Sequence, residues 1–276
     1  MSTTMTSPTG LGPHKQLPPG RYSLVDQMRS EWTKLVSVRS TIWTLALTIV
    51  IGIGVSALAA AETRSHWNTN PHFGFDPTSL SLTGVFVAQL IIGVLGVLVM
   101  SAEYGTGTIR ATLSATPRRP GVLVAKASVF GIVALVVSMV TAFLSFFVGQ
   151  ALLSAPAVHA TLSTPGALRE ILGTGIFLFL VGLFALAIAT LIRHTAGAIS
   201  TFVGILLVLP TVLQALPNSI HNDIERFLPS RIGIEVLSHG HQPPFVFSPW
   251  VGLAVMAGYT AVLLVIAGVK MSKRDA

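Results

Sequence analysis

The chain has 276 residues, of which 51% are hydrophobic and only 10% are charged. A soluble fold of this composition would lack enough polar surface to cover itself, so the composition predicts an integral membrane protein. The formal net charge of +7 would suggest nucleic acid in a soluble chain. In a membrane protein it fits cytoplasmic loops beside anionic lipid, and we expect membrane lipids and no nucleic acid as partners. The chain has no cysteine, which excludes disulfides, thiolate metal ligands and a cysteine nucleophile.

The first 41 residues predict two different segments. Residues 1–22 are rich in Ser, Thr, Pro and Gly, and we expect a disordered cytoplasmic tail. Residues 23–41 carry apolar residues at helical spacing and begin with Ser23 and Asp26, the pattern of a capping box. This helix is too polar to span and suits the membrane interface, either as a simple anchor or as an elbow that also braces a cytoplasmic subunit. Its expected interfacial residues are Met28, Trp32, Lys34 and Leu35.

Six apolar stretches follow within residues 42–276, each long enough to cross a bilayer. They are expected at about residues 42–61, 82–102, 122–153, 171–192, 196–216 and 249–269. The third is longer than a bilayer needs, so we expect it to tilt or to project, with Lys126 snorkelling near its start. Arg193 and the next two residues predict a tight hairpin between the fourth and fifth spans, and Pro210 predicts a kink in the fifth.

Charge fixes the expected orientation. If the N-terminus is cytoplasmic, most of the 17 Lys and Arg residues fall in inner segments, and only Arg64, Arg169, Arg226 and Arg231 fall outside. The positive-inside rule therefore places both termini in the cytoplasm. The predicted fold class is an all-α membrane protein of the cell membrane, multi-pass, with six transmembrane helices and an N-terminal interfacial amphipathic helix.

The long segment 217–248 is then external, and its mixture of apolar and charged residues predicts one or two short helices against the external mouth. Its histidines, with the more distant His66, raise the hypothesis of a metal site. No spacing matches a helical pair of ligands, and the close pair His239 and His241 lies beside prolines and a glycine. We therefore expect solvated loop histidines and no metal.

The sequence lacks the usual motifs of catalysis. Gly105 and Gly107 do not fit a phosphate loop or a dinucleotide fingerprint, and no nucleophile elbow or zinc helix is present. No Asp or Glu falls within a predicted span, although proton relays and intramembrane enzymes normally need one. We expect a chain that is not an enzyme and binds no cofactor, and the same absence argues against a secondary transporter.

Two segments carry a family resemblance. They are Met28-Arg-Ser-Glu-Trp-Thr-Lys-Leu in the first helix, and Ser101-Ala-Glu-Tyr-Gly-Thr-Gly-Thr-Ile-Arg-Ala-Thr-Leu, followed by Thr116-Pro-Arg-Arg, after the second span. With six spans and a long external segment before the last, this arrangement resembles the ABC-2 type ABC transporter permeases. In that family a Glu-Tyr-x-x-Gly-Thr-Ile-Arg-type sequence recurs in the first cytoplasmic loop, and it is similar to a coupling helix that docks into a groove of the ATPase subunit.

The resemblance implies that the cytoplasmic loop 103–121 is a docking site. The residues that it implies for ATPase docking are Glu103, Tyr104, Gly105, Thr106, Gly107, Thr108, Ile109, Arg110, Leu113, Arg118 and Arg119. Glu103 would pair with a basic residue of the partner or cap the next helical turn, and the two glycines would let the chain turn sharply. The alternative is a plain turn between two helices, held by lipid contacts.

The implied function is that of the transmembrane permease subunit of an ATP-driven ABC transporter. We expect an exporter of amphiphilic or hydrophobic cargo such as a lipid, peptide or antibiotic. A separate ABC ATPase would carry ATP and Mg and hydrolyse the nucleotide, and a second permease chain, identical or similar, would complete the pathway. The alternative function is a non-transporting accessory or sensor subunit that anchors a soluble partner.

Overall fold

The computed structural model describes residues 23–67, 75–105, 107, 119–153, 158–238 and 245–274. Within these ranges the regular elements are all helical. In chain order they are α1 (Leu24–Ser37), α2 (Arg39–Ser65), α3 (Pro77–Ser81), α4 (Val85–Gly105), α6 (Arg119–Leu152), α7 (Ala167–Ile192), α8 (Thr195–Val203), the π-helical turn η1 (Gly204–Val208), α9 (Leu209–Leu213), α10 (Asn218–Glu225), α11 (Pro229–Leu237) and α12 (Pro249–Arg274).

Six helical segments are long and apolar enough to cross a membrane, which confirms the predicted fold class of an all-α membrane protein with six spans. They are α2, α4, α6, α7, α8 continued through α9, and α12. Helix α6 has 34 residues, and at about 1.5 Å per residue it is roughly 50 Å long, longer than a bilayer core as predicted. Large apolar side chains such as Leu58 and Val265 are exposed on the outside of the bundle, as expected for a surface that faces lipid.

Helix α7 is the central helix and packs against α4, α6 and α12. Its crossing with α4 depends on glycines, because a Cβ atom added to Gly96 would lie 2.3 Å from the carbonyl oxygen of Gly182. Small residues of this kind let two transmembrane helices approach closely. The core around this crossing contains Ile92, Phe130 and Phe202, all with no exposed surface.

The N-terminal helix begins where the sequence predicts. The Ser23 hydroxyl accepts a hydrogen bond from the amide of Val25, and Asp26 Oδ2 accepts one from the amide of Ser23, which confirms the capping box. The helix ends earlier than the predicted residue 41. Val38 is extended (φ −85°, ψ 105°) and separates α1 from α2, so the expected interfacial segment contains the first residues of the first span.

The hairpin between α7 and α8 is as tight as predicted. Arg193 lies in the left-handed region (φ 63°), and its amide donates to the carbonyl oxygen of Ala189. His194 caps the next helix, because its Nδ1 atom accepts from the amide of Gly197 at 3.2 Å. Two residues thus reverse the chain.

The fifth span is irregular where Pro210 predicts a kink. One π-helical turn, η1, interrupts it directly before Leu209 and Pro210, and the Leu209 amide bonds to the carbonyl oxygen of Gly204. A proline has no amide hydrogen and crowds the carbonyl four residues earlier. The wider turn accommodates that crowding without breaking the span.

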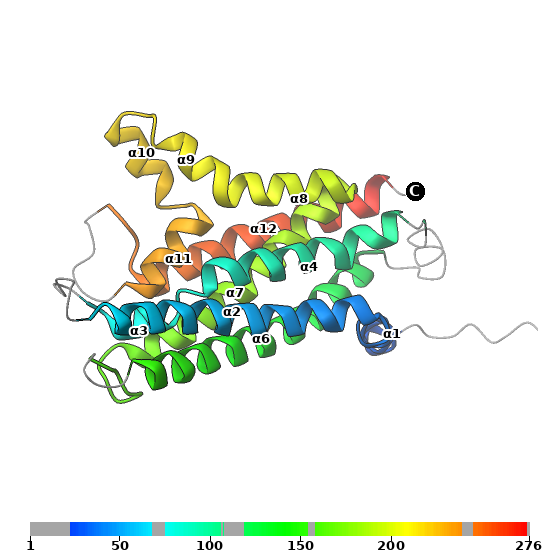
Figure 1. The fold of residues 1–276 in the computed structure, drawn as a ribbon. Helices are drawn as coiled ribbons and strands as arrows, with labels where there is room; N and C mark the ends of the chain where they lie inside the picture. Colours follow the sequence, from blue (N-terminus) through cyan, green and yellow to red (C-terminus); the bar gives the residue numbers. More distant parts are fainter. Residues whose placement is uncertain are drawn as a thin grey trace, which may run out of the picture.

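The bundle has two distinct ends. Helix α1, the start of α6, the α7–α8 hairpin and the last turn of α12 lie together at one end, which we call the α1 end (Figure 1). Helices α3, α10 and α11 lie at the opposite end. The sequence predicts one or two short helices within residues 217–248, and the described part of this segment has two, α10 and α11, of which α11 packs against α7 and α12.

Candidate functional site

Four charged side chains from three helices meet at the α1 end. Lys34 Nζ donates to Glu31 Oε1 at 2.6 Å and to Glu103 Oε1 at 2.8 Å. Lys126 Nζ donates to Glu31 Oε2 at 2.5 Å and to Glu103 Oε1 at 2.9 Å. Each lysine thus binds both glutamates, and we call this group the charged cluster.

The charged cluster is mostly buried. The side chain of Lys126 is 3% exposed, and those of Glu31 and Glu103 are 6% and 12% exposed. The desolvation free energy of an isolated buried charge exceeds the net stability of a typical fold. Two acids and two bases offset this free energy only if their ion pairs have good geometry. The short contacts on both lysines meet this condition.

Lys34 is the solvent-facing member, with a side chain that is 41% exposed. Its partial burial disfavours the charged form, but hydrogen bonds and charge attraction from Glu103 and Glu31 outweigh that and hold its pKa above the ordinary 10.5. Lys34 therefore stays protonated at every physiological pH.

The charged cluster joins three parts of the chain that are far apart in sequence. Glu31 and Lys34 belong to α1, Glu103 to the end of α4 and Lys126 to the start of α6. Helices α4 and α6 flank the segment 106–118, of which only Gly107 is described. The cluster therefore joins α4 to α6, and joins both helices to α1.

These contacts differ from what the sequence predicts for Lys126 and for Glu103. Lys126 does not snorkel, because its ammonium group is enclosed by two carboxylates of the same chain. Glu103 is held by Lys34 and Lys126 of its own chain, whereas the sequence suggested a basic residue of a partner or a cap for the next turn.

A cavity of about 470 Å³ lies beside the charged cluster, between α1, α2 and α4. Its walls combine the charged side chains with apolar ones such as Leu35 and Leu98 and with the hydroxyl residue Thr41. All four members of the cluster, Lys126 of α6 included, line this space, which extends toward α2.

Two further contacts tie other helices to the same end. The guanidinium of Arg193 lies 5.6 Å from the ring centroid of Tyr104, within reach of a cation–π interaction. Lys270 of α12 donates to the carbonyl oxygen of Leu191 at 3.0 Å, in the last turn of α7. The ends of α4, α7 and α12 are therefore held to one another as well.

The predicted docking residues divide into two groups. Glu103, Tyr104 and Gly105 are the last residues of α4, and Arg119 is the first of α6. Gly107 has φ +70°, so the chain does turn at a glycine here. The residues that lie outside the described ranges are Thr106, Thr108, Ile109, Arg110, Leu113 and Arg118.

The predicted interfacial residues lie on different sides of α1. Lys34 joins the charged cluster, Leu35 packs against the core, Met28 lines a second cavity and Trp32 is 51% exposed. Placement of this helix in a membrane interface stays a prediction.

Sequence reasoning missed Glu31, which is buried although it lies on a helix that is mostly exposed. A signal was present in the sequence. Glu31 and Lys34 share one helical face, the second span ends beside the acidic Glu103, and the third begins beside the basic Lys126. A charged residue inside an apolar span, as Lys126 is, implies a partner, and α1 supplies it.

The histidines do not gather into a metal site in the described part of the chain, where no group of three or more potential ligands occurs. His66 pairs with Glu62 at 3.1 Å and His221 with Glu225 at 3.0 Å, each one helical turn apart. His239 and His241 lie outside the described residues.

A profile of the family described as ABC-2 family transporter protein matches residues 28–211, which include most of α1, the charged cluster, the first four spans and nearly all of the fifth. A search of curated proteins finds no match. Because the profile covers about two thirds of the chain, and six apolar helices agree with a permease, the chain belongs to the ABC-2 family of transporter proteins.

Proposed function

We propose that this permease is the transmembrane subunit of an ATP-driven exporter and that a separate ABC ATPase docks on the segment 103–113, at the α1 end. ATP and Mg are bound by that ATPase, and the permease transmits the work. The cargo class that fits is amphiphilic or hydrophobic, such as a lipid, a peptide or an antibiotic. In this proposal both termini and the α1 end face the cytoplasm, in agreement with the distribution of Lys and Arg.

The charged cluster is the observation that carries the proposal. A soluble ATPase can drive a membrane bundle only if the segment that it pushes is rigidly attached to the spans. Glu103 and Lys126 lie at the two helix ends that flank residues 106–118, and both are bonded to α1. A push on this segment therefore displaces α4, α6 and α1 together.

The neighbouring space supports the same role. The cavity of about 470 Å³ lies where α1 bends into α2, and Val38 is a break between these helices. Packed interfaces move between discrete arrangements, and such a movement needs room beside the element that moves. We infer that α1, with α4 and α6, shifts relative to α2. A second permease chain, identical or similar, completes the pathway.

Co-expression with the ATPase encoded nearest to this chain tests the proposal. The variants are Arg110→Ala and Leu113→Ala in the docking segment, Lys126→Met in the cluster, and Arg64→Ala as a control far from the α1 end. Co-purified ATPase, ATP hydrolysis in nanodiscs and efflux from cells would be measured together.

The expected pattern separates docking from transmission. The docking variants lose the ATPase, Lys126→Met retains it but loses stimulated hydrolysis and efflux, and Arg64→Ala behaves as the wild type. Normal binding and efflux in Arg110→Ala and Leu113→Ala would contradict the docking site. A bound ATPase whose hydrolysis never depends on this chain would instead support the accessory or sensor subunit.

A further inference from the structure

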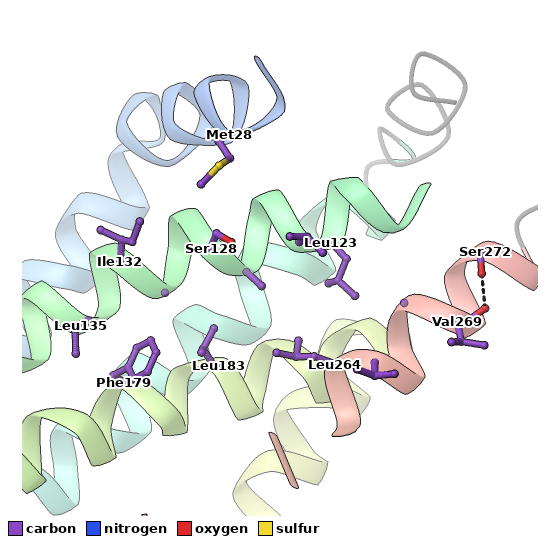
Figure 2. A pocket seen from close by; sticks show the side chains of 15 residues that line it. Met28, Leu123, Ser128, Ile132, Leu135, Phe179, Leu183, Leu264, Val269 and Ser272 are labelled. Carbon is purple, nitrogen blue, oxygen red and sulfur yellow. Dashed lines mark hydrogen bonds between the residues drawn. The ribbon is translucent and has the colours of Figure 1, made fainter. Parts of the chain in front are cut away.

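A second cavity, of about 850 Å³, lies on the outside of the bundle, between α6, α7 and α12 (Figure 2). Leu123 and Leu135 mark its extent along α6, Phe179 and Leu183 of α7 line it, and Leu264 lines it from α12. Met28 of α1 reaches it at the α1 end. It is a different cavity from the one beside the charged cluster, and the proposed coupling role does not use it.

Small residues create this cavity. Helices α6 and α12 present Ala127, Gly131 and Gly268 to it, and α12 packs mainly on α7. A Cβ atom added to Gly268 would lie 3.7 Å from Leu123, an ordinary contact, so this position has space for a larger side chain. The cavity therefore exists because the sequence places small residues at these positions.

The lining is almost entirely apolar. Its hydroxyl residues are Ser128 and Ser272, and the Ser272 hydroxyl donates to the carbonyl oxygen of Val269 in its own helix (Figure 2). Water has few partners in such a space, whereas a hydrocarbon chain fits it. Exposed rim residues, among them Ile132 and Val265, show that the cavity opens sideways out of the bundle. In a membrane that side is lipid.

The dimensions and charges match one lipid. Between Leu123 and Leu135, α6 rises by about 18 Å, which is close to the hydrocarbon thickness of a single leaflet, about 15 Å. At the α1 end, Arg29 and Lys273 directly follow the lining residues Met28 and Ser272 in the chain, and both are exposed. Arg29 and Lys273 do not line the cavity, but their long side chains extend from the same end of the bundle, where cations suit an anionic headgroup phosphate.

We propose that this cavity binds one acyl chain of an anionic phospholipid from the leaflet on the α1 side, with the headgroup phosphate near Arg29 and Lys273. The inference rests on the proposed orientation of the α1 end and not on the ATPase. Because Met28 belongs to α1, a bound lipid also contacts the helix that the charged cluster holds.

Photo-labelling in nanodiscs tests the site. The probes are phosphatidylglycerol and phosphatidylcholine that carry a diazirine near the end of one acyl chain, and the labelled peptides are identified by mass spectrometry. The cavity is filled by Gly268→Leu and, independently, by Ser128→Leu. The matched control is Gly258→Leu, since this glycine is exposed on the same helix with no atom near its added Cβ.

Phosphatidylglycerol is expected to label the peptides of α6 and α12 that line the cavity. Each filling variant should lower this labelling about tenfold, because it excludes roughly two methylene groups of the chain. Gly258→Leu should leave it unchanged. The double variant Arg29→Gln with Lys273→Gln should remove the preference over phosphatidylcholine. ATPase co-purification is scored in the same samples, so failure of the lipid site and failure of the docking proposal are distinguishable.

Two outcomes would overturn the site. Labelling spread evenly over the outward faces of all the spans would mean ordinary boundary lipid. The chain has no cysteine, so Val265→Cys provides a single thiol on the rim. An efficient disulfide between two copies at that position would show that a second copy covers the cavity.

Discussion

Lys126 Nζ lies 2.5 Å from Glu31 Oε2, although 95 residues separate the two side chains. The contact joins a span to a helix outside the spans, and both side chains are almost completely buried. Removing either member leaves the charged cluster with one unbalanced buried charge, so the pair stabilises one position of α1 on the bundle.

Glu103→Gln tests the strength of the charged cluster. The change leaves Lys126 buried with only Glu31 as a charged partner, so the loss should be smaller than the loss of about 3–5 kcal/mol for a buried charge with no partner at all. We expect the unfolding temperature in detergent to fall clearly. Glu62→Gln is the control, because Glu62 has a side chain that is 74% exposed. Equal effects of the two variants would contradict a structural role for the cluster.

The double variant Glu103→Leu with Lys126→Leu separates charge from geometry. With both charges removed, much of the stability lost in Glu103→Gln should return, because no unpaired ion remains buried. ATPase stimulation should not return, since the link from α4 to α1 through Lys34 is lost. Recovery of both would show that apolar packing alone transmits the movement.

Gly96→Ala tests the crossing of α4 with α7. The new methyl would lie 2.3 Å from the backbone oxygen of Gly182, which cannot rotate away as a side chain can. We expect a loss of about 1–3 kcal/mol from overpacking, measured by thermal unfolding. In α2, Gly54 has no atom within 4 Å of an added Cβ, so Gly54→Ala should be neutral or stabilise by roughly 0.5–1 kcal/mol.

Ser56→Ala tests a buried link between α2 and the turn before α4. The Ser56 hydroxyl has no exposed surface and accepts from the amide of Gly84 at 3.0 Å. Without it that amide has no side-chain acceptor in an apolar surrounding, which costs about 1–3 kcal/mol. Ser65→Ala at the exposed end of the same helix should cost much less. Similar unfolding temperatures for the two would refute the link.

The six spans could be predicted because each rests on a local property, a run of apolar residues of bilayer length. The cap at Ser23 and the hairpin at Arg193 were equally local. Glu31 could not be placed in this way, because its burial depends on α4 and α6, which lie far along the chain. Most residues of α1 are exposed, so the sequence of this helix alone does not indicate that one of its sides is buried. The break at Val38 was missed because valine is not a strong helix breaker.

The protonation of Lys34 predicts a loss of stability at alkaline pH. Its pKa in the folded protein is raised above 10.5, so its contribution is complete below 10.5 and is lost as the pH rises through the folded pKa. We expect the difference in unfolding temperature between wild type and Lys34→Gln to be constant near neutral pH and to shrink above 10.5. A difference that stays unchanged far above pH 10.5 would contradict this assignment.

Gly107→Ala and Gly105→Ala make the same chemical change two residues apart, and we expect them to differ. Gly105 ends α4 in helical geometry, so alanine there should be neutral or slightly stabilising. Gly107 has φ +70°, a region that costs an L-residue about 1–2 kcal/mol, and no neighbouring atom obstructs an added Cβ at either position. The difference therefore reports backbone conformation alone. ATPase co-purification and stimulated hydrolysis should fall only in Gly107→Ala, because the chain leaves α4 through this turn. If Gly105→Ala is the more harmful variant, or if both behave as the wild type, the turn at Gly107 does not position the docking segment.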